Sequence, residues 1–160
     1  MSDLRVGIGV DAHALREGVP LVLAGVGIPG EPGLVGHSDG DVLSHALIDA
    51  LLGAAGLGDI GELFSSAEAR WQGASSISLL QHTCQVIREA GFELVNADCV
   101  LVGEQPRIAP LRAEMRVRLA GAMGTEPDRV TVRATTTDGL GFTGRGEGLA
   151  AHAVALLRRA

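Results

Sequence analysis

The sequence predicts an α+β fold, a two-layer sandwich with helices packed on one face of a small, mixed, four-stranded sheet. Short segments with the period of strands alternate with longer amphipathic segments, without repeats or linkers between them. The 160 residues are 46% hydrophobic and 20% charged, which favours a compact globule over a disordered chain. We therefore expect a single domain over residues 1–160, large enough to bury a core.

The first strand is expected over residues 5–13, where successive side chains alternate between two faces. Val6 and Ile8 share one face of this strand. Asp11 and His13 lie side by side on the other face, which is the arrangement that two ligands of one metal ion require.

A second short strand is expected over residues 20–24, paired with the first through a turn at Glu17 and Gly18. The segment 26–40 is rich in glycine and proline and predicts a loop.

A helix follows over residues 41–55, with Ser38 or Asp39 available as its N-cap. His45 lies one turn inside this helix, on the same stripe as Asp41. It can therefore approach the two polar side chains at the end of the first strand.

The remaining elements are predicted from the same periodicities and from glycine and proline signals. They are a loop over 64–74, a helix over 75–90, strands over 93–102 and 130–136, a helix over 111–123, a glycine-dense loop over 139–148 and a final apolar helix over 149–158.

Composition excludes several classes of function. The net charge is −6 and the chain has no lysine, which excludes a Walker A phosphate loop and disfavours nucleic acid as a partner. No apolar run reaches the roughly 20 residues of a membrane span, and no signal peptide is recognisable at the start. Cys84 and Cys99 fit neither a disulfide framework nor a CxxC metal site, so we expect buried thiols in a cytoplasmic protein.

Asp11, His13 and His45 together predict a metal site. One carboxylate and two imidazoles with an open fourth position are typical of catalytic zinc. In the alternative interpretation, Asp11 accepts turn hydrogen bonds and each histidine is a satisfied core residue. Spacing alone leaves both interpretations open.

Two glycine-rich segments match GxGxxG, a weak pattern by itself. After 25–30 the prolines prevent the helix that would hold a pyrophosphate, and after 139–144 no βαβ unit remains, so a dinucleotide fold is disfavoured. The second loop, with Arg145 beside it and Thr135 to Asp138 before it, still offers donors for phosphate and a carboxylate for Mg²⁺. The alternative is a packed glycine turn.

These motifs resemble the 2-C-methyl-D-erythritol 2,4-cyclodiphosphate synthase family over nearly the whole chain. The matching motifs are G-x-D-x-H at 9–13, H-S-D-G-D-x-x-x-H at 37–45, G-D-I-G at 58–61, A-T-T-T at 134–137 and G-F-T-G-R-G-E-G at 141–148. The second and the last are long and specific.

The resemblance implies a phosphorus–oxygen lyase of the non-mevalonate route to isoprenoids. Such enzymes convert 4-diphosphocytidyl-2-C-methyl-D-erythritol 2-phosphate to the cyclic 2,4-diphosphate and release CMP. The 2-phosphate attacks the β-phosphorus of the same molecule, so catalysis consists of folding the substrate and neutralising charge. The family forms homotrimers with active sites between neighbouring subunits.

The resemblance also implies two metals. Zn²⁺, or another divalent transition metal, is expected at Asp11, His13 and His45, beside a substrate phosphate. Mg²⁺ or Mn²⁺ on the diphosphate is expected at Asp138.

His37 and Thr136 match the positions that stabilise the transition state. Further positions that match substrate contacts, with 103–108 forming the cytidine pocket, are Ser38, Asp59, Ile60, Gly61, Gly103, Glu104, Gln105, Pro106, Arg107, Ile108, Thr135, Thr137, Phe142 and Arg145.

Three departures from the family pattern affect the expected substrate contacts. Asp138 stands where Glu is common and is shorter by one methylene, so we expect it to reach the ion differently or through water. Gly139 stands where Lys is frequent, and 65–68 replaces a more acidic stretch. The predicted zinc ligands are unaffected.

Two other functions are compatible with parts of the sequence pattern. A non-catalytic trimer that binds isoprenoid diphosphates in an apolar axial cavity would bind them without releasing CMP. An unrelated zinc hydrolase would release inorganic phosphate instead of a cyclic product. The complete set of ligands favours the cyclase over both.

Overall fold

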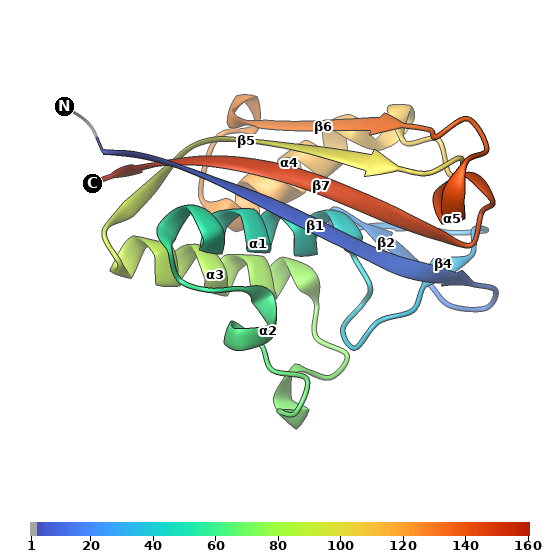
Figure 1. Ribbon diagram of the computed structural model, residues 1–160, viewed down its shortest axis with the longest axis horizontal. Helices are drawn as coiled ribbons and strands as arrows, with labels where there is room; N and C mark the ends of the chain where they lie inside the picture. Colours follow the sequence, from blue (N-terminus) through green and yellow to red (C-terminus); the bar gives the residue numbers. More distant parts are fainter. Residues whose placement is uncertain (1–2) are drawn as a thin grey trace.

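The computed structural model describes residues 3–160 and has the expected α+β architecture, with one correction to the sheet. Within this range five strands, instead of the predicted four, form a mixed sheet in the order β4-β1-β7-β5-β6 (Figure 1). A separate two-stranded ribbon pairs β2 with β3.

The sheet is built on two long antiparallel strands, β1 (Leu4–Arg16) and β7 (Gly148–Arg159). On the other side of β7, β5 (Phe92–Val102) also pairs antiparallel. β6 (Val130–Thr135) adds to β5 in parallel, and the short β4 (Gly33–Leu34) pairs with the end of β1.

β7 replaces the helix that the sequence predicted over 149–158, and that prediction is wrong. Ala151 and Ala153 are buried on the face toward the helices, whereas His152 and Val154, which alternate with them, are exposed. Alanine and leucine favour helices, but hydrogen bonding on both edges to β1 and β5 overrides that preference. The inward-facing residues of β7 are small alanines, so the sequence does not show the alternation of large apolar and polar residues that usually marks a strand.

The predicted strand at 20–24 exists as β2 (Leu21–Leu23), but its predicted pairing with the first strand is wrong. β2 pairs instead with β3 (Val26–Ile28), which lies inside the predicted loop. Ala24 and Gly25 both have positive φ, 51° and 75°. This conformation reverses the chain direction in a two-residue hairpin loop.

Three longer helices cover one face of the sheet: α1 (Val42–Ala55), α3 (Ser76–Glu89) and α4 (Arg112–Met123). α1 packs on β1 and β7, α3 packs on α1, and α4 packs between α3 and β6 (Figure 1). The predicted helices over 41–55, 75–90 and 111–123 are therefore confirmed. Short helices and turns complete the chain at Ile60–Leu63 (α2), Ala69–Trp71, Ala109–Leu111, Pro127–Arg129 and Gly141–Gly144 (α5).

Among residues 3–160, no helix combines the length and the apolar character that crossing a membrane requires.

α1 lies very close to β1 because two glycines face it. A Cβ on Gly7 would lie 2.0 Å from the carbonyl oxygen of Ala50, and a Cβ on Gly9 would lie 1.8 Å from that of Ala46. No other residue fits at these distances without moving the backbone. The glycine face of β1 is therefore the inner face, and the valines and isoleucine of the strand point away from the helices.

The N-cap of α1 is Asp41. The prediction that Ser38 or Asp39 would be the N-cap is wrong. The Asp41 carboxylate accepts hydrogen bonds from the backbone N–H and the hydroxyl of Ser44, at 3.1 and 2.7 Å. It also accepts the N–H groups of Ala24 and Gly25, each at 2.8 Å. Burial raises the pKa of Asp41, and these four donated bonds oppose that rise. The β2–β3 hairpin is thus fastened to the start of α1.

The segment 64–74 follows α2 and is anchored by aromatic contacts. The ring of Phe64 lies edge-on to those of Trp71 and His82, at centroid distances of 4.9 and 5.7 Å. These contacts hold the segment against α3.

Candidate metal and phosphate site

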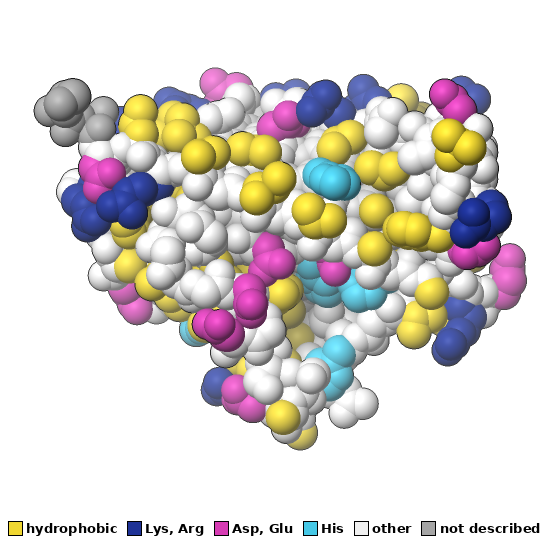
Figure 2. Space-filling view, viewed as in Figure 1, with side chains coloured by type: hydrophobic (Ala, Val, Ile, Leu, Met, Phe, Trp, Pro, Cys, Tyr) yellow, Lys and Arg dark blue, Asp and Glu magenta, His cyan; other side chains and the backbone are white. Residues whose placement is uncertain are grey.

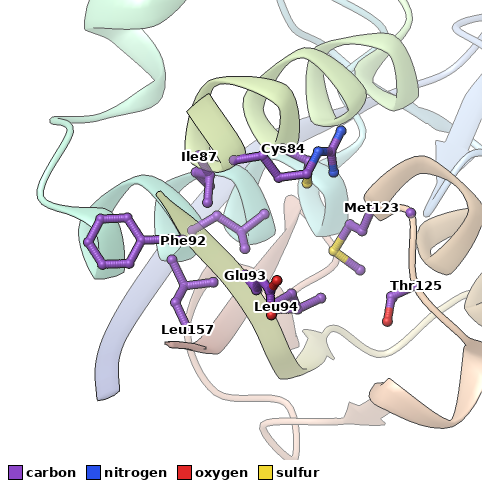
Figure 3. Close-up of a pocket in the computed structure, with 11 residues that line it drawn as sticks. Cys84, Ile87, Phe92, Glu93, Leu94, Met123, Thr125 and Leu157 are labelled. Carbon is purple, nitrogen blue, oxygen red and sulfur yellow. The ribbon is translucent and has the colours of Figure 1, made fainter. Parts of the chain in front are cut away.

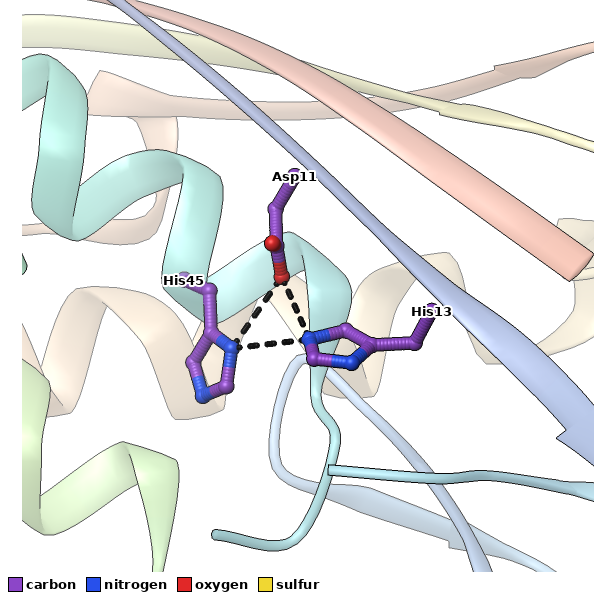
Figure 4. A group of neighbouring side chains, drawn as sticks. All are labelled: Asp11, His13 and His45. Carbon is purple, nitrogen blue, oxygen red and sulfur yellow. Dashed lines mark hydrogen bonds and ion pairs between the residues drawn. The ribbon is translucent and has the colours of Figure 1, made fainter. Parts of the chain in front are cut away.

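The inner face of β1 and the first turns of α1 bring Asp11, His13 and His45 together (Figure 4). Asp11 Oδ2 lies 2.8 Å from His13 Nε2 and 3.1 Å from His45 Nδ1. The two ring nitrogens are 3.3 Å apart. The predicted convergence of these three side chains is confirmed.

The three ligand atoms have nearly the spacing that one metal ion needs. Ligands at about 2.0–2.2 Å from a tetrahedral ion lie about 3.3 Å from one another. The observed separations of 2.8, 3.1 and 3.3 Å need only a slight opening to match that value. A carboxylate with two imidazoles suits Zn²⁺ and other divalent transition metals alike.

Each imidazole ring is oriented by a hydrogen bond to the ring nitrogen that points away from the other ligands. His13 Nδ1 donates to the carbonyl oxygen of Val35 at 2.8 Å, so in the neutral ring the lone pair is on Nε2, facing the other ligands. His45 Nε2 lies 2.9 Å from Ser38 Oγ and 2.8 Å from Ser76 Oγ. The opposite nitrogen of that ring, Nδ1, faces the site.

The electrostatics of the site keep Asp11 ionised. Burial alone would raise its pKa, but hydrogen bonds from His13 and His45 outweigh burial and lower the pKa to about 2. The hydrogen bond to Asp11 raises the pKa of His13, against the opposing effect of burial. The metal-free site therefore favours an ion pair between Asp11 and His13.

α2 is fastened to the helix that carries His45. Asp49, one turn after His45, accepts the N–H of Ile60 at 2.7 Å. Asp59 caps α2 by accepting the N–H of Glu62 at 2.9 Å. The predicted substrate-contact segment at Asp59, Ile60 and Gly61 is thereby held beside α1.

A second group of predicted residues lies in a separate cavity of about 450 Å³. Its walls comprise 103–112, except Pro110 and Leu111, with Ala134, Thr135 and Thr136. All of the predicted cytidine segment is present, but none of the triad residues lines this cavity. Within one chain, the structure does not bring the two halves of the predicted site into one pocket.

The turn after β6 places its polar side chains at the surface. Thr136 Oγ1 lies 3.2 Å from Asp138 Oδ1, and Asp138 has a positive φ of 52°. Thr137 donates its hydroxyl hydrogen to the carbonyl oxygen of Leu140 at 2.6 Å, so it stabilises the turn.

The glycine-rich loop that follows contains the short helix α5. Phe142 in this helix remains 43% exposed, and Arg145 just after it forms an exposed ion pair with Glu147 at 2.6 Å. His37 is also exposed, and its carbonyl oxygen accepts the N–H of Gly73 at 3.0 Å.

Another cavity, of about 300 Å³, lies between the ends of α1, α3 and α4 (Figure 3). Its walls are mostly apolar, with the free thiol of Cys84 among them. Burial raises the pKa of Cys84 to about 11, and that of Cys99 to about 12, so neither thiol is a ready nucleophile. The prediction of two buried thiols is confirmed.

The sequence analysis missed four polar residues around these sites. Asp39 and Ser76 contact one another behind His45, and Asp49 holds α2. Arg112 lines the larger cavity with its Nε buried and, within the described chain, without a hydrogen-bond partner. Asp39 and Ser76 are 37 positions apart, so no spacing pattern could have joined them.

Comparison with known proteins identifies the family of the chain. The profile of the YgbB family matches residues 4–158. The chain belongs to this family. A YgbB relative from Pelotomaculum thermopropionicum, named 2-C-methyl-D-erythritol 2,4-cyclodiphosphate synthase, is 53% identical over 156 residues, covering 98% of this chain and 96% of the relative. One from Rubrobacter xylanophilus with the same name is 55% identical and covers 100% of this chain and 98% of the relative.

Solved structures of similar proteins have the same fold. The bifunctional IspDF of Campylobacter jejuni superposes with a TM-score of 0.96 at 42% identity, covering 100% of this chain and 43% of that one. A CDP-bound 2C-methyl-D-erythritol-2,4-cyclodiphosphate synthase gives a TM-score of 0.88 at 40% identity, over 96% of this chain and 99% of that one. The resemblance to the cyclodiphosphate synthases is therefore confirmed, and the YgbB family to which the chain belongs is one of enzymes.

Proposed function

We propose that this protein converts 4-diphosphocytidyl-2-C-methyl-D-erythritol 2-phosphate to 2-C-methyl-D-erythritol 2,4-cyclodiphosphate and CMP. It would act as a phosphorus–oxygen lyase in non-mevalonate isoprenoid synthesis, as one domain over residues 1–160. The observation that carries the proposal is a triad with the spacing to hold a metal ion, in a chain that is 53% identical to a synthase of this name. The cytoplasmic location stays a prediction from the sequence.

The reaction is an intramolecular phosphoryl transfer. An oxygen of the 2-phosphate forms a bond to the β-phosphorus, the bond from that phosphorus to the bridging oxygen breaks, and CMP leaves with the bridging oxygen. Both reacting groups are anionic and belong to one molecule. The protein therefore has to fold the substrate and offset negative charge more than it has to supply a nucleophile.

The triad is suited to the phosphate end of the substrate. Asp11, His13 and His45 would hold a divalent transition metal, with the rings oriented by the partners already described. When bound, the ion supplies positive charge to phosphate oxygens. His37 and Ser38 precede α1 on the same loop, where an exposed imidazole and a hydroxyl can donate to the same phosphate.

The larger cavity is suited to the nucleotide end. Its volume of about 450 Å³ lies within the range of about 300–1,000 Å³ typical of small-molecule sites. Residues 103–108 would surround the base, and Thr135 and Thr136 would donate to the diphosphate. Asp138 lies next to Thr136 at the surface, where its carboxylate can bind Mg²⁺ or Mn²⁺ directly or through water.

A homotrimer would bring these two halves together. The outer face of the sheet exposes Leu4 by 54%, Val6 by 69% and Ile8 by 68%, and Val10 and Val154 extend the same surface. Figure 2 shows hydrophobic side chains gathered across this side of the molecule. An apolar face of this kind is typical of an interface between subunits. Packing three such faces together would set the triad of one subunit beside the cavity of its neighbour, with Phe142 and Arg145 near the axis.

Phosphorus NMR of the reaction products is the direct test. With Zn²⁺ and Mg²⁺ present, we expect the cyclic diphosphate and CMP, and we expect turnover to stop when the metals are chelated. His45→Ala should lower turnover at least about 1,000-fold, because it removes a metal ligand. His82→Ala, a change of the same type on α3 among Phe64 and Trp71, should leave turnover within about twofold.

The same assay separates the alternatives. Inorganic phosphate as the product would favour a zinc hydrolase. Binding of isoprenoid diphosphates without CMP release would favour the non-catalytic trimer. Unchanged turnover in His45→Ala would contradict the role of the triad.

A further inference from the structure

His45 is held by the buried side chain of Ser76, and Ser76 by the half-buried side chain of Asp39, and neither the family motifs nor the proposed reaction assigns a role to these two residues. Ser76 is the first residue of α3 and is fully buried, and its Oγ lies 2.8 Å from His45 Nε2. The hydroxyl of Ser76 also forms a short hydrogen bond to Asp39 Oδ1. His45, Ser76 and Asp39 therefore form a continuous chain leading away from the triad.

Asp39 itself is fixed in place. Its Oδ2 accepts the N–H of Ser76 at 3.0 Å, and its Oδ1 accepts the N–H of Asp41 at 3.1 Å. These N–H groups belong to the beginnings of α3 and α1. The carboxylate thus joins the starts of two helices, and it also accepts the hydrogen of the Ser76 hydroxyl.

The direction of the hydrogen bonds follows from the acceptor at the far end. A carboxylate only accepts, so the hydroxyl hydrogen of Ser76 is committed to Asp39. The oxygen of Ser76 can then only accept from His45, which requires the ring hydrogen to be on Nε2. This bond favours the tautomer whose lone pair is on Nδ1, the nitrogen that would bind the ion, whereas Asp11 Oδ2, 3.1 Å from Nδ1, favours a hydrogen on Nδ1 in the metal-free site.

We propose that Ser76 and Asp39 are positioning residues that hold His45 in the tautomer and ring orientation needed to bind a metal ion. This inference rests on the metal-binding part of the proposed function and not on the identity of the substrate. For His13 the corresponding partner is the backbone carbonyl of Val35. Of the two histidines, therefore, only His45 has a tautomer that depends on side chains.

A purely structural role can be distinguished from this one. Capping of α3 uses the Asp39 carboxylate and the backbone N–H of Ser76, and it needs no hydroxyl. Ser38 Oγ is also within 2.9 Å of His45 Nε2, but it is partly exposed, and its other side-chain bond is a 3.4 Å contact with Ser76. Ser76 is therefore the hydroxyl whose orientation is fixed.

The test compares the Zn²⁺ affinity of full-length variants by competition with a chelating dye, without substrate. Loss of an outer-shell partner of a ligating histidine costs about 10- to 100-fold in metal affinity, and we expect this loss in Ser76→Ala. Ser75→Ala is the matched control. Ser75 is exposed and its side chain makes no cap bond, so affinity should stay within about twofold.

A second readout is the tautomer of His45, followed by ¹⁵N NMR of histidine-labelled protein without metal. Wild-type protein should show hydrogen on Nε2, and Ser76→Ala should shift hydrogen from Nε2 to Nδ1, where Asp11 is the remaining acceptor. If Ser76→Ala does not fold, Asp39→Asn is measured instead, because it preserves shape but replaces one of the two accepting oxygens by a donating NH₂ group. Asp39→Asn should also weaken Zn²⁺ binding and shift hydrogen from Nε2 to Nδ1 of His45.

The possible failures can be told apart. A wild-type protein that does not bind Zn²⁺ would overturn both the metal site and this proposal. Tight wild-type binding, with equal affinity and an unchanged tautomer in the Ser76 and Asp39 variants, would overturn only this proposal.

Discussion

The inner and outer faces of β1 differ in the size of their side chains and in what covers them. The inner face carries Gly7 and Gly9 beneath α1, and then two of the three triad residues. The outer face carries Val6 and Ile8, which are 69% and 68% exposed. In most half-buried strands the larger apolar residues face the helices, so this strand reverses the usual arrangement.

The reversal shows how one strand can serve two purposes. Glycines let the backbone of α1 approach, which brings His45 close enough to share a metal ion with Asp11 and His13. The branched side chains on the other face are free to pack against a second copy of the chain. The predictions that follow test each face separately.

The largest effect is expected on the inner face. Gly9→Val would place a side chain against the backbone of Ala46, so we expect a loss of about 3 kcal/mol or more in the free energy of unfolding. Urea denaturation measures this loss. Gly53→Ala is the control: it lies in α1 with nothing nearer than 3.9 Å to its Cβ, and should gain about 0.5–1 kcal/mol. Equal stability of the two variants would contradict the close approach of α1 to β1.

The next effect is expected on the outer face. Ile8→Asp puts a carboxylate on the proposed interface, so association should weaken at least about 100-fold, or about 2.8 kcal/mol, while each subunit stays folded. Analytical ultracentrifugation and circular dichroism measure these two properties. Val117→Asp is a matched change on α4, where Val117 is 57% exposed. A trimer that survives Ile8→Asp, or dissociates equally with Val117→Asp, would place the interface elsewhere.

The smallest effect concerns protons, which compete with the metal on the inner face alone. Metal binding needs a neutral His13, whose pKa is raised by its hydrogen bond to Asp11. Below that raised pKa, Zn²⁺ affinity should fall about tenfold per pH unit, or about 1.4 kcal/mol. Asp11, with a pKa of about 2, does not contribute to the slope near neutral pH.

Calorimetric titration with Zn²⁺ between pH 8 and pH 5 measures this dependence. Asp11→Asn removes the bond that raises the pKa of His13, so the loss of affinity should begin at a lower pH, from a weaker starting value. Onset at an unchanged pH would show that another group controls the titration of His13.

The sequence predicted the metal triad well because its residues follow local geometry. Asp11 and His13 are two positions apart on a strand, and His45 lies one turn inside a helix whose start is marked by polar residues. The helices over 75–90 and 111–123 were predicted correctly for the same reason, since their periodicity and their glycine C-terminal signals are local.

The errors arose where long-range packing decided the structure. The alanine-rich segment of β7 is a strand because it lies between β1 and β5, which no local pattern reveals. The chain Asp39–Ser76–His45 joins three segments that are distant in sequence. The division of the site into two halves was implied by the resemblance, but nothing in the spacing of residues indicated it.

The hydrogen bonds of Asp41 have a mechanical consequence for the metal site. Asp41 and His45 are four residues apart, so they lie on one side of α1, and turning that helix by one residue rotates its side chains by about 100°. Such a rotation would separate Asp41 from the N–H groups of Ala24 and Gly25 and would also turn His45 away from Asp11. The β2–β3 hairpin therefore opposes rotation of α1 about its axis. The direction in which His45 points is set in part by a turn that contains none of the ligands.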